Sequence, residues 1–484
     1  MKKRILLIIP PISEKLEAVW YSEIYLGLAY LASLAAKAGH QIKVIDCDSE
    51  FHPLLSLENK VKKFKPDIIG LTSLYGSLNN AFKIAKKLKQ KSNTKIVMGG
   101  LPATFIPEHI LKNCKDIDIL VRGEGEYTFM DIIEGKKISE IDGISYKKNG
   151  TITHNNERKP IQDLDELGFP LRKIFPLKKY KIRAGFGSRK STAIETSRGC
   201  PYGCSFCVQS PKEGRKLRLR SPTTVVNELY KISLEHKKIK RVMIVDNDFL
   251  TNPPHAKQIL KSIIDKKLNK RFEYMIATRV NNLLKEGDEL LKLLYRANVR
   301  TIYFGIEAVG KKHRCNIGKI KSFKNTLKLF KRLEKLDIDP LASYIFGFPD
   351  ENKKDIETTL RFAKFLNTKN FSFNILTPYP KTPLFNIYHK KNLIENYNYN
   401  DFDNAHKILK NPKNIETSFK KIHRKYILRS GFLKEITIYN LFKRQSVGRI
   451  SMVIYYLLFW EIRTILRSVK RNFKKNFKET TFET

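Results

Sequence analysis

Three cysteines gather in one short segment, T-S-R-G-C-P-Y-G-C-S-F-C-V-Q, at residues 196–209. Cys200, Cys204 and Cys207 are half of the six cysteines in a chain of 484 residues. Clustered thiolates are soft ligands that suit zinc or an iron–sulfur cluster. Structural zinc takes four protein ligands, and no fourth cysteine or histidine adjoins the trio. A four-iron cluster can be held by three cysteines, which leaves one iron for a ligand that is not protein.

The spacing of the trio does not decide between these sites. C-x-x-x-C-x-x-C differs from the C-x-x-C-x-x-C run of ferredoxins. On spacing alone, an iron–sulfur cluster, a zinc ion and chance all stay open.

The cysteine segment opens a series of six strand–helix units. Strand patterns occur at 192–196, 241–246, 272–278, 300–306, 341–347 and 371–377. Helical patterns lie between them at about 222–237, 253–268, 286–297, 321–337 and 353–367. Six units are short of the eight that close a full barrel, so we expect a partial (β/α)6 TIM-type barrel over 191–385. Cys200 follows its first strand, at the rim where such barrels carry functional loops.

A second alternation of strands and helices precedes the barrel. Near-continuous apolar strands are expected at 5–9, 42–46, 67–71, 95–100 and 118–123, with helices at 26–37, 78–91 and 126–134. This pattern predicts an α/β fold with a doubly wound parallel sheet, Rossmann- or flavodoxin-like, over residues 1–138. Such sheets bind ligands beyond the carboxyl ends of their strands. Residues 139–190 are punctuated by prolines and predict a linker with a small hairpin at Asn149–Gly150.

Composition and charge limit the classes of protein to which the chain can belong. The length predicts two or three domains. Lys and Arg number 92 against 48 Asp and Glu, a net charge of +44. That charge suits an acidic partner, but it is spread along the chain and does not form one nucleic-acid-binding block. The first apolar run stops at Pro10 without a cleavage site, and no run approaches the roughly 20 residues of a membrane span. We therefore expect a cytoplasmic protein with reduced thiols.

The C-terminal region, 386–484, is predicted to be helical and basic. Residues 450–471 read I-S-M-V-I-Y-Y-L-L-F-W-E-I-R-T-I-L-R-S-V-K-R, with an apolar core too short to span a bilayer. Trp460 and the flanking cations suit a helix in the membrane interface, which gives peripheral contact with the inner face of the membrane through 445–478. A helix packed on the barrel with a solvated basic flank explains the pattern equally well. The membrane interpretation implies a lipid or apolar substrate.

The cysteine segment and its context resemble the radical S-adenosylmethionine (SAM) superfamily, whose signature is C-x-x-x-C-x-aromatic-C. Further matches follow in the family's order: V-D-N-D-F (245–249), A-T-R (277–279), Y-F-G-I-E (303–307), I-F-G-F-P-D-E (345–351) and L-T-P-Y-P-K-T-P-L-F (376–385). Lys381 replaces a usual glycine in the last of these. The first domain resembles the cobalamin (B12)-binding subgroup through P-P, L-G-L-A-Y-L-A-S, I-I-G-L-T-S, I-V-M-G-G-L-P-A-T and V-R-G-E-G-E. The resemblance covers about 1–385 and points to a class B methyltransferase-like protein.

The resemblance implies three cofactors: a [4Fe-4S] cluster on the cysteine trio, SAM on its open iron, and cobalamin. It implies SAM contacts from Phe206, Asp246, Asn247, Asp248, Arg279, Gly305, Glu307 and Pro349. Cobalamin contacts are expected from Thr72, Ser73, Tyr75, Gly99, Gly100, Pro102, Gly123 and Glu124. The D-x-H-x-x-G motif that gives cobalt a histidine is absent, since Asp46 is followed by C-D-S-E-F. The lower face of cobalt is therefore expected near the loop 73–75.

Each of these residues also has a plainer interpretation. The three polar residues at 246–248 could cap the helix that begins near Pro253. Glu307 and Arg279 could be solvated charges, and Gly99 and Gly100 could be ordinary turn glycines. The remaining cysteines are expected to be small buried hydrophobic residues and the lone histidines to be surface or loop residues: Cys47, Cys114 and Cys315, and His40, His52 and His109.

The resemblance implies that one electron, from an external donor of flavodoxin or ferredoxin type, cleaves SAM to methionine and a 5′-deoxyadenosyl radical. That radical takes hydrogen from an unactivated carbon, and cobalamin-dependent methyl transfer to the substrate is the leading expectation. Cyclisation or oxidation stays open, because some family members do these instead. The small-molecule or lipid substrate itself is not identified by the sequence.

Two further alternatives explain the basic charge. A tRNA methylthiotransferase would carry three cluster cysteines in its N-terminal domain, where this chain has only Cys47 and Cys114. A zinc- or cluster-bearing nucleic-acid-binding protein without enzymatic activity is the other. We do not expect nucleic acid as a partner.

Overall fold

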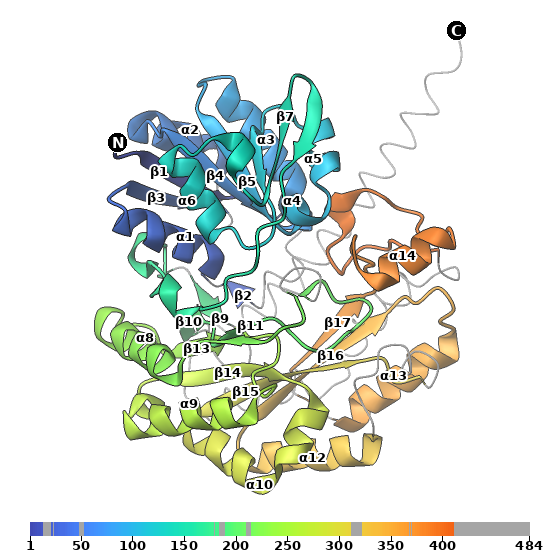
Figure 1. Ribbon diagram of the computed structural model, residues 1–484. Coiled ribbons are helices and arrows are strands. Elements are labelled where there is room, and N and C mark those ends of the chain that lie inside the picture. Colours follow the sequence, from blue (N-terminus) through green and yellow to red (C-terminus); the bar gives the residue numbers. More distant parts are fainter. Residues whose placement is uncertain are drawn as a thin grey trace. The chain divides into compact units, whose positions relative to one another are not determined.

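The computed structural model describes residues 1–12, 21–22, 24–47, 53–178, 180–182, 189–209, 214–310, 322–366, 368 and 370–410 (Figure 1). The chain from Met1 to Lys413 forms one compact unit. The segment predicted to lie at a membrane interface, 445–478, is outside the described residues, as are His52 and Cys315.

The first sheet contains five parallel strands. Their spatial order is β3 (Gln41–Asp46), β1 (Arg4–Ile9), β4 (Ile68–Ser73), β5 (Lys95–Gly100) and β6 (Ile119–Val121). This is the order of flavodoxin-like doubly wound sheets, in which the ligand site lies where the order reverses, here beside β1 and β4. Five of the six residues of β1 are buried, because helices cover both faces of the sheet. The predicted doubly wound sheet is confirmed.

Helices cover the two faces of this sheet in separate groups. On one face lie α1 (Leu26–Lys37) and α6 (Glu126–Glu134), which contact each other. On the other lie α2 (Pro53–Phe64), α3 (Leu78–Lys89), the short α4 (Leu101–Phe105) and α5 (Pro107–Asn113). The periodicity in the sequence predicted α1, α3 and α6 but missed α2, α4 and α5.

A hairpin extends the first sheet beyond β6. Strands β7 (Ile144–Lys148) and β8 (Thr151–His154) pair antiparallel, and β7 pairs antiparallel with β6. The connecting residues Asn149 and Gly150 both have positive φ, 50° and 80°, as a type I′ turn requires. The predicted hairpin is confirmed, and the predicted linker thus contributes two strands to the first sheet.

The second sheet has six parallel strands, which confirms the partial barrel. In spatial order these are β17 (Asn370–Ile375), β16 (Asp339–Phe346), β15 (Val299–Glu307), β14 (Glu273–Thr278), β13 (Arg241–Ile244) and β10 (Arg189–Ile194). Two short antiparallel strands, β9 (Lys181–Ile182) and β2 (Tyr21–Ser22), follow β10.

Helices line the outer side of this curled sheet (Figure 1): α8 (Pro222–Glu235), α9 (Pro253–Asp265), α10 (Val280–Arg296), α12 (Phe323–Lys335) and α13 (Lys353–Leu366). Side-chain oxygens of Ser221, Asn252 and Ser322 cap α8, α9 and α12. After β17 comes α14 (Pro383–Lys390), followed by a 3-10 turn at Tyr399–Asp401. No helix in the described ranges combines the length and hydrophobicity needed to cross a bilayer.

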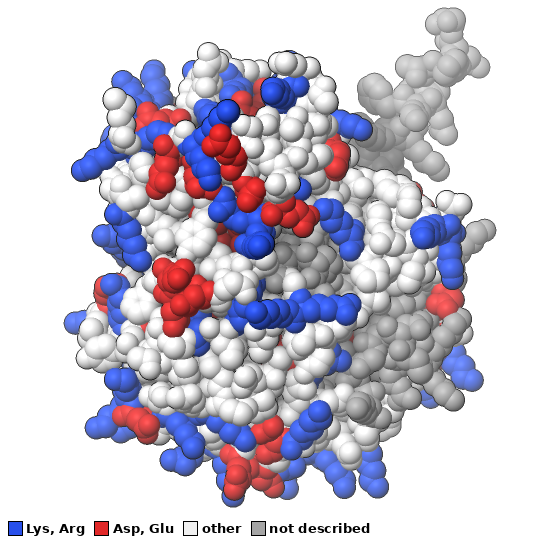
Figure 2. Space-filling model, in the orientation of Figure 1, with Lys and Arg blue, Asp and Glu red and all other residues white. Residues whose placement is uncertain are grey.

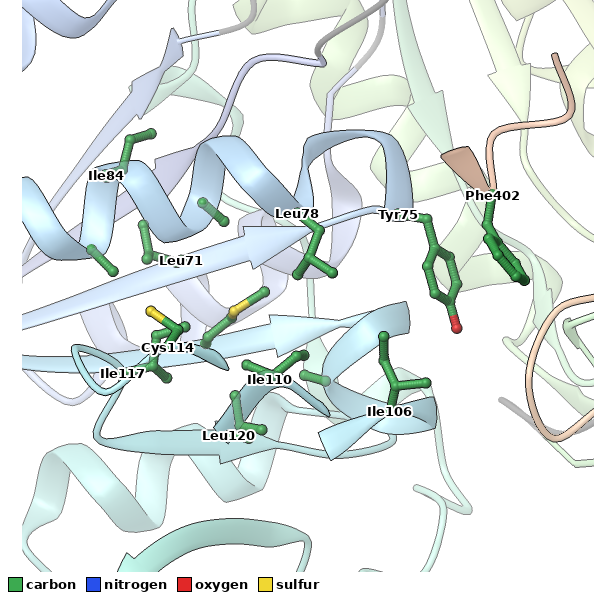
Figure 3. Close-up of a cluster of buried hydrophobic side chains, with 14 of the residues drawn as sticks. Leu71, Tyr75, Leu78, Ile84, Ile106, Ile110, Cys114, Ile117, Leu120 and Phe402 are labelled. Atoms are coloured by element: carbon green, nitrogen blue, oxygen red, sulfur yellow. The ribbon is translucent and has the colours of Figure 1, made fainter. Parts of the chain in front are cut away.

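The apolar core under α2, α3 and α5 extends to the carboxyl ends of the strands. Figure 3 shows Leu71, Leu78 and Ile110 packed together, with Tyr75 and Phe402 side by side at one end of the cluster. Cys47 and Cys114, 0% and 4% exposed, belong to this core, which confirms them as buried hydrophobic residues. On the surface, Lys and Arg are spread among Asp and Glu over the face in Figure 2 and do not gather in one patch.

Candidate functional site

The cysteine loop leaves the second sheet through a narrow ribbon. Strand β11 (Ser197–Arg198) pairs antiparallel with β12 (Arg218–Leu219), and the three cysteines lie on the loop between them. Gly199 has a φ of 89°, and a Cβ there would lie 2.2 Å from the carbonyl oxygen of Lys216. Only glycine allows this approach, so the residue before Cys200 is fixed by the fold of the loop.

Cys200, Cys204 and Cys207 are all half-buried. The Cys207 amide donates to the Cys204 carbonyl at 3.1 Å, which tightens the turn between the two thiols. Burial raises the pKa of Cys200, and the neighbouring thiols of Cys207 and Cys204 raise it further. In the described part of the chain, no three Cys, His, Asp or Glu side chains converge on a single-ion site. Three neighbouring thiols are soft ligands of the kind that bind an iron–sulfur cluster.

Arg279, at the end of β14, reaches the middle of the cysteine loop. Its Nη1 donates to the Sγ of Cys204 at 3.7 Å, and its guanidinium lies 4.1 Å from the ring centroid of Tyr202. Asn282, in the first turn of α10, donates through Nδ2 to the Tyr202 hydroxyl at 2.7 Å and to Asp248 at 2.8 Å. The backbone amide of Arg279 also donates to Asp248, at 3.3 Å, which closes the network.

Two aspartates that follow β13, Asp246 and Asp248, accept hydrogen bonds from other residues of the fold. Asp246 accepts from the Thr196 amide at 2.7 Å and from the Ser197 hydroxyl at 2.7 Å, which ties β13 to β11. Asp248 accepts from the Thr278 hydroxyl at 2.7 Å. Burial raises the pKa of both carboxyl groups.

Asn247 lies between these two aspartates and is half-buried at the rim. None of the three residues caps α9, because Asn252 does so. The helix-cap interpretation of this segment is therefore wrong.

Two further rim positions have unusual backbone conformations. Glu307 ends β15 at a φ of 64°, is 6% exposed, and follows a register shift after Gly305. A non-glycine residue in this left-handed region marks local strain, which tends to persist at functional sites. Glu307 is therefore not a solvated surface charge. After β16, Gly347 has a φ of 93° and donates its amide to Glu351 at 2.5 Å, and the predicted Pro349 lies in this turn.

At the strand ends of the first sheet, the predicted glycines have different environments. A Cβ on Gly100 would lie 2.3 Å from the Ser73 carbonyl, and its φ is 104°, so the fold itself requires that glycine. A Cβ on Gly99 would meet nothing closer than 3.9 Å, and one on Gly123 would meet no described atom within 4 Å. Gly123 therefore leaves open space beyond β6, which fits a bulky cofactor, whereas a Cβ on Gly99 would be in ordinary van der Waals contact with Val121.

The loop after β4 presents both apolar and polar groups. Ser73 is buried and donates to the Leu74 carbonyl at 2.8 Å, whereas Leu74 is 39% exposed and Thr72 half-buried. Tyr75 is 2% exposed, and no described group hydrogen-bonds to its hydroxyl. A buried hydroxyl without a protein partner suits a polar group of a ligand. Pro102 is buried at the start of α4.

Several aromatic rings surround Tyr75 and form an aromatic group of side chains with it. Its ring centroid lies 5.2 Å from that of Tyr379 and 5.9 Å from that of Phe402. Tyr399 stacks edge-on against His109 of α5, with ring centroids 4.8 Å apart, so His109 lies on a helix and not in a loop. His40 is half-buried, and its Nδ1 accepts a hydrogen bond from the Lys3 amide.

A groove of about 600 Å³ lies beside this aromatic group. Its lining comes from α4, α5 and the segment around α14: Phe105, Ile106, Glu108, His109, Pro380, Lys381, Phe385, Asn386 and Tyr399. Lys381 has a φ of 64° and donates its Nζ to the Thr104 carbonyl at 3.2 Å. A lysine thus fills the position at which the family has a glycine. It keeps the left-handed backbone conformation, and its side chain joins the segment 376–385 to α4.

Two family models match the chain. A model of the radical SAM superfamily matches residues 194–363, and a B12 binding domain model matches residues 18–133. An uncharacterized methyltransferase of Pyrococcus horikoshii, PH0819, is 32% identical over 450 residues, which are 92% of this chain and 95% of that protein. The chain belongs to the cobalamin-binding radical SAM family. It is a radical SAM enzyme of methyltransferase-like type, and its cofactors are a [4Fe-4S] cluster, SAM and cobalamin.

Other relatives of this radical SAM enzyme have different named activities. The anaerobic magnesium-protoporphyrin IX monomethyl ester cyclase of Cereibacter sphaeroides is 27% identical over 392 residues, 79% of this chain and 63% of that protein. The hopanoid C-3 methylase of Methylococcus capsulatus is 25% identical over 397 residues, 79% of this chain and 72% of that protein.

Solved structures show the same fold. OxsB, a cobalamin-dependent SAM radical enzyme, solved with aqua-cobalamin and SAM bound, superposes with a TM-score of 0.71 at 20% identity, covering 95% of this chain and 71% of that one. The radical SAM methyltransferase TsrM of Kitasatospora setae superposes with a TM-score of 0.65 at 18% identity, covering 81% of this chain and 75% of that one.

The alternative of a protein without enzymatic activity is wrong, because the chain belongs to an enzyme family.

The residues of this radical SAM enzyme fit its cofactors, but the individual contacts stay predictions. The structure brings Phe206, Asn247, Arg279, Gly305, Glu307 and Pro349 to the loops and strand ends of the partial barrel. Glu124 instead has both carboxylate oxygens bonded to Arg218. Tyr202 and Asn282 were not predicted from the sequence, since only the folded chain shows that they contact each other and, through Arg279 and Asp248, hold the cysteine loop.

Proposed function

We propose that this enzyme methylates an unactivated carbon of an apolar or lipid substrate. When bound, the cluster and SAM supply a 5′-deoxyadenosyl radical, and cobalamin supplies the methyl group. The groove between α4–α5 and α14 carries the proposal, because apolar and aromatic side chains line about half of it: Phe105, Ile106, Pro380, Phe385 and Tyr399. Polar side chains line the rest: Glu108, His109, Lys381 and Asn386. Such mixed walls suit a lipid or other apolar molecule that carries a polar group, because the polar side chains can orient it.

The groove is connected to both cofactor regions. The amide of Leu384, in α14, donates to the carbonyl of Ser205 in the cysteine loop at 2.9 Å. On the other side, the Tyr399 ring centroid lies 6.3 Å from that of Tyr75, which follows β4. A substrate in the groove would therefore lie against segments that belong to the cysteine loop and to the cobalamin-binding sheet.

The chain's own residues would position the reactants and exclude water. We assign Asn247 and Glu307 to SAM binding, since both lie at the barrel rim, where the family resemblance expects SAM contacts. The tyrosines around Tyr75 would keep water from the reacting carbon. A dry site protects a reactive radical from side reactions.

Cyclisation is the second candidate. It is favoured by three anaerobic magnesium-protoporphyrin IX monomethyl ester cyclases among the relatives, at 25–28% identity. The chain is more similar to the P. horikoshii methyltransferase, at 32%, so we rank methyl transfer first.

Labelled SAM distinguishes the two candidates. The anaerobically reconstituted enzyme, with cobalamin and a reductant, is incubated with SAM carrying a trideuterated methyl group and a lipid extract from the source cells. Methyl transfer predicts an extract component that gains one trideuterated methyl group. Formation of 5′-deoxyadenosine together with an unlabelled, hydrogen-poorer product would favour cyclisation or oxidation and contradict the methyl transfer.

We also propose that an acidic one-electron carrier of flavodoxin or ferredoxin type reduces the cluster. Arg215 and Lys216 are exposed on the cysteine loop, and opposite charges guide such encounters. The double variant R215E/K216E should slow cluster reduction by reduced flavodoxin about tenfold, but not reduction by dithionite. K62E/K63E on α2 is the matched control. Equal rates with flavodoxin in all three proteins would contradict this docking surface.

Peripheral membrane contact through 445–478 and a cytoplasmic location stay predictions. Flotation with anionic liposomes tests the contact directly. The full-length protein should float, and a version cut at residue 440 should not. Equal flotation of the two would remove the membrane interpretation.

A further inference from the structure

A buried ionic group joins the base of the cysteine loop to the first sheet. Both terminal nitrogens of Arg218, on β12, donate to the carboxylate of Glu124 at 2.9 and 2.8 Å. Arg198, on β11, donates to Glu126 at 2.8 Å and lies 3.5 Å from Glu124. These four side chains are 3–10% exposed.

The arrangement has a defined register. Arg198 and Arg218 are directly paired across the β11–β12 ribbon. The two glutamates flank Gly125, where the turn after β6 leads into α6: Glu124 lies in the turn and Glu126 is the first residue of the helix. Two neighbouring cations therefore meet two neighbouring anions, and a shift of the ribbon along the turn would leave buried charges without partners. Such a mismatch costs far more than the pairs themselves contribute to stability.

Further hydrogen bonds hold these side chains in place. Glu124 accepts the Ile161 amide at 2.7 Å, and Arg218 donates to the Ile161 carbonyl at 2.6 Å. Arg198 additionally donates to Glu195, at 2.8 Å, just before the ribbon. Because the pairs include a two-pronged arginine–carboxylate contact, they fix orientation as well as distance.

We propose that Glu124, Glu126, Arg198 and Arg218 form a clamp that sets the position of the cluster-binding loop relative to the cobalamin-binding edge. Arg198 is two residues from Cys200, and Glu124 follows Gly123, which opens onto the space beyond β6. We assign the clamp residues a positioning role, because their charged groups are bonded to one another. This inference rests on the proposed placement of the cluster and cobalamin at these two edges.

The variants E124Q and R218Q test the clamp in the full-length protein. E124Q keeps the shape of the side chain and its acceptor for Ile161, so it tests the ionic contact with little change in packing. R218K keeps the charge but loses the two-pronged geometry, and should be intermediate. The control is R241Q, which breaks a similarly buried pair, Arg241–Glu273 at 3.0 Å, within the second sheet.

Two measurements are made. Hydrogen–deuterium exchange on the cofactor-free protein follows residues 199–217 and 123–126. Electron paramagnetic resonance on the loaded protein follows the magnetic interaction between the reduced cluster and cobalt(II) of cobalamin, which depends steeply on their separation. Iron and cobalamin content per chain are measured alongside, so that loss of a cofactor is not mistaken for loss of position.

The clamp predicts at least threefold faster early exchange in both segments for E124Q and R218Q, and a magnetic interaction weakened by half or more at unchanged cofactor content. R241Q should match the wild type in both measurements. Wild-type exchange and wild-type magnetic interaction in E124Q and R218Q would overturn the clamp. If the wild type binds no cluster or cobalamin, the proposed function fails, while the exchange measurement still decides whether the clamp exists.

Discussion

The guanidinium of Arg279 donates to the Sγ of Cys204 across 3.7 Å. A cation that hydrogen-bonds a cluster thiolate stabilises the added negative charge of the reduced cluster. The arginine is held there by the Tyr202 ring, at 4.1 Å, and by its own backbone contact with Asp248. The sequence resemblance predicts a SAM contact for this residue, and the geometry leads us to predict a second role, in setting the reduction potential of the cluster.

The variant R279Q should therefore have a cluster that is harder to reduce. At the wild-type midpoint potential, we expect the ratio of reduced to oxidised cluster to fall about tenfold, which for one electron is about 59 mV. Redox titration followed by paramagnetic resonance measures it. R300Q is the control, because Arg300 stacks on Tyr295 at 4.6 Å, at the opposite end of β15. An unchanged midpoint in R279Q, at full iron content, would remove this role.

Two adjacent glycines should respond differently to substitution. G99A adds a methyl group at van der Waals distance from Val121, 3.9 Å, so stability should be little changed. If Gly99 contacts cobalamin as predicted, cobalamin affinity should fall about tenfold, or about 1.4 kcal/mol. G100A places a methyl group 2.3 Å from the Ser73 carbonyl at a φ of 104°, and should lower the free energy of unfolding by roughly 1–3 kcal/mol. Urea unfolding and cobalamin titration measure the two quantities. Normal cobalamin affinity in G99A would place the cofactor elsewhere.

Glu351 gives the stability of the enzyme a specific pH dependence. Burial raises the pKa of its carboxyl group from 4.5 to about 7. In the unfolded chain this carboxyl group loses its proton near pH 4.5. The folded state therefore binds more protons than the unfolded state between about pH 4.5 and pH 7. Its contribution to the free energy of unfolding is full below about pH 4.5 and is lost as pH rises through 7, by on the order of 3 kcal/mol.

The variant E351Q removes this titration. From pH 5 to 8, the wild type should lose stability relative to E351Q in urea unfolding. E357Q, on the exposed side of α13, the helix that follows Glu351, should follow the wild type. Parallel pH profiles for all three proteins would show that Glu351 ionises normally in the fold.

Substitutions of Lys381 test its left-handed backbone conformation in the segment 376–385. K381G removes the steric cost of this conformation but also the bond to Thr104 and some unfolded-state order, so its net effect should be within about 0.5 kcal/mol. K381V keeps a side chain but adds branching at a φ of 64°, and should destabilise by about 1–2 kcal/mol. Thermal or urea unfolding compares the two. Equal stability of K381G and K381V would contradict the conformation.

The sequence predicted the parts of the structure that depend on local pattern. Apolar runs located the strands of both sheets, and Asn149–Gly150 located the hairpin. The sequence could not show that Asp246 and Asp248 are consumed by hydrogen bonds while Asn247 lies between them at the rim, because their partners come from other strands. Glu124 shows the same limit: its neighbours in sequence suggest a cofactor contact, but Arg218, 94 positions later, occupies its carboxylate.

The central claim is that Cys200, Cys204 and Cys207 hold a cluster that cleaves SAM reductively. The direct measurement is 5′-deoxyadenosine formed by the anaerobically reconstituted enzyme with SAM and dithionite, compared with the three single variants C200A, C204A and C207A. We predict 5′-deoxyadenosine and methionine from the wild type in equal amounts, and neither product above background from any variant. Undiminished 5′-deoxyadenosine from a cysteine variant would contradict the account.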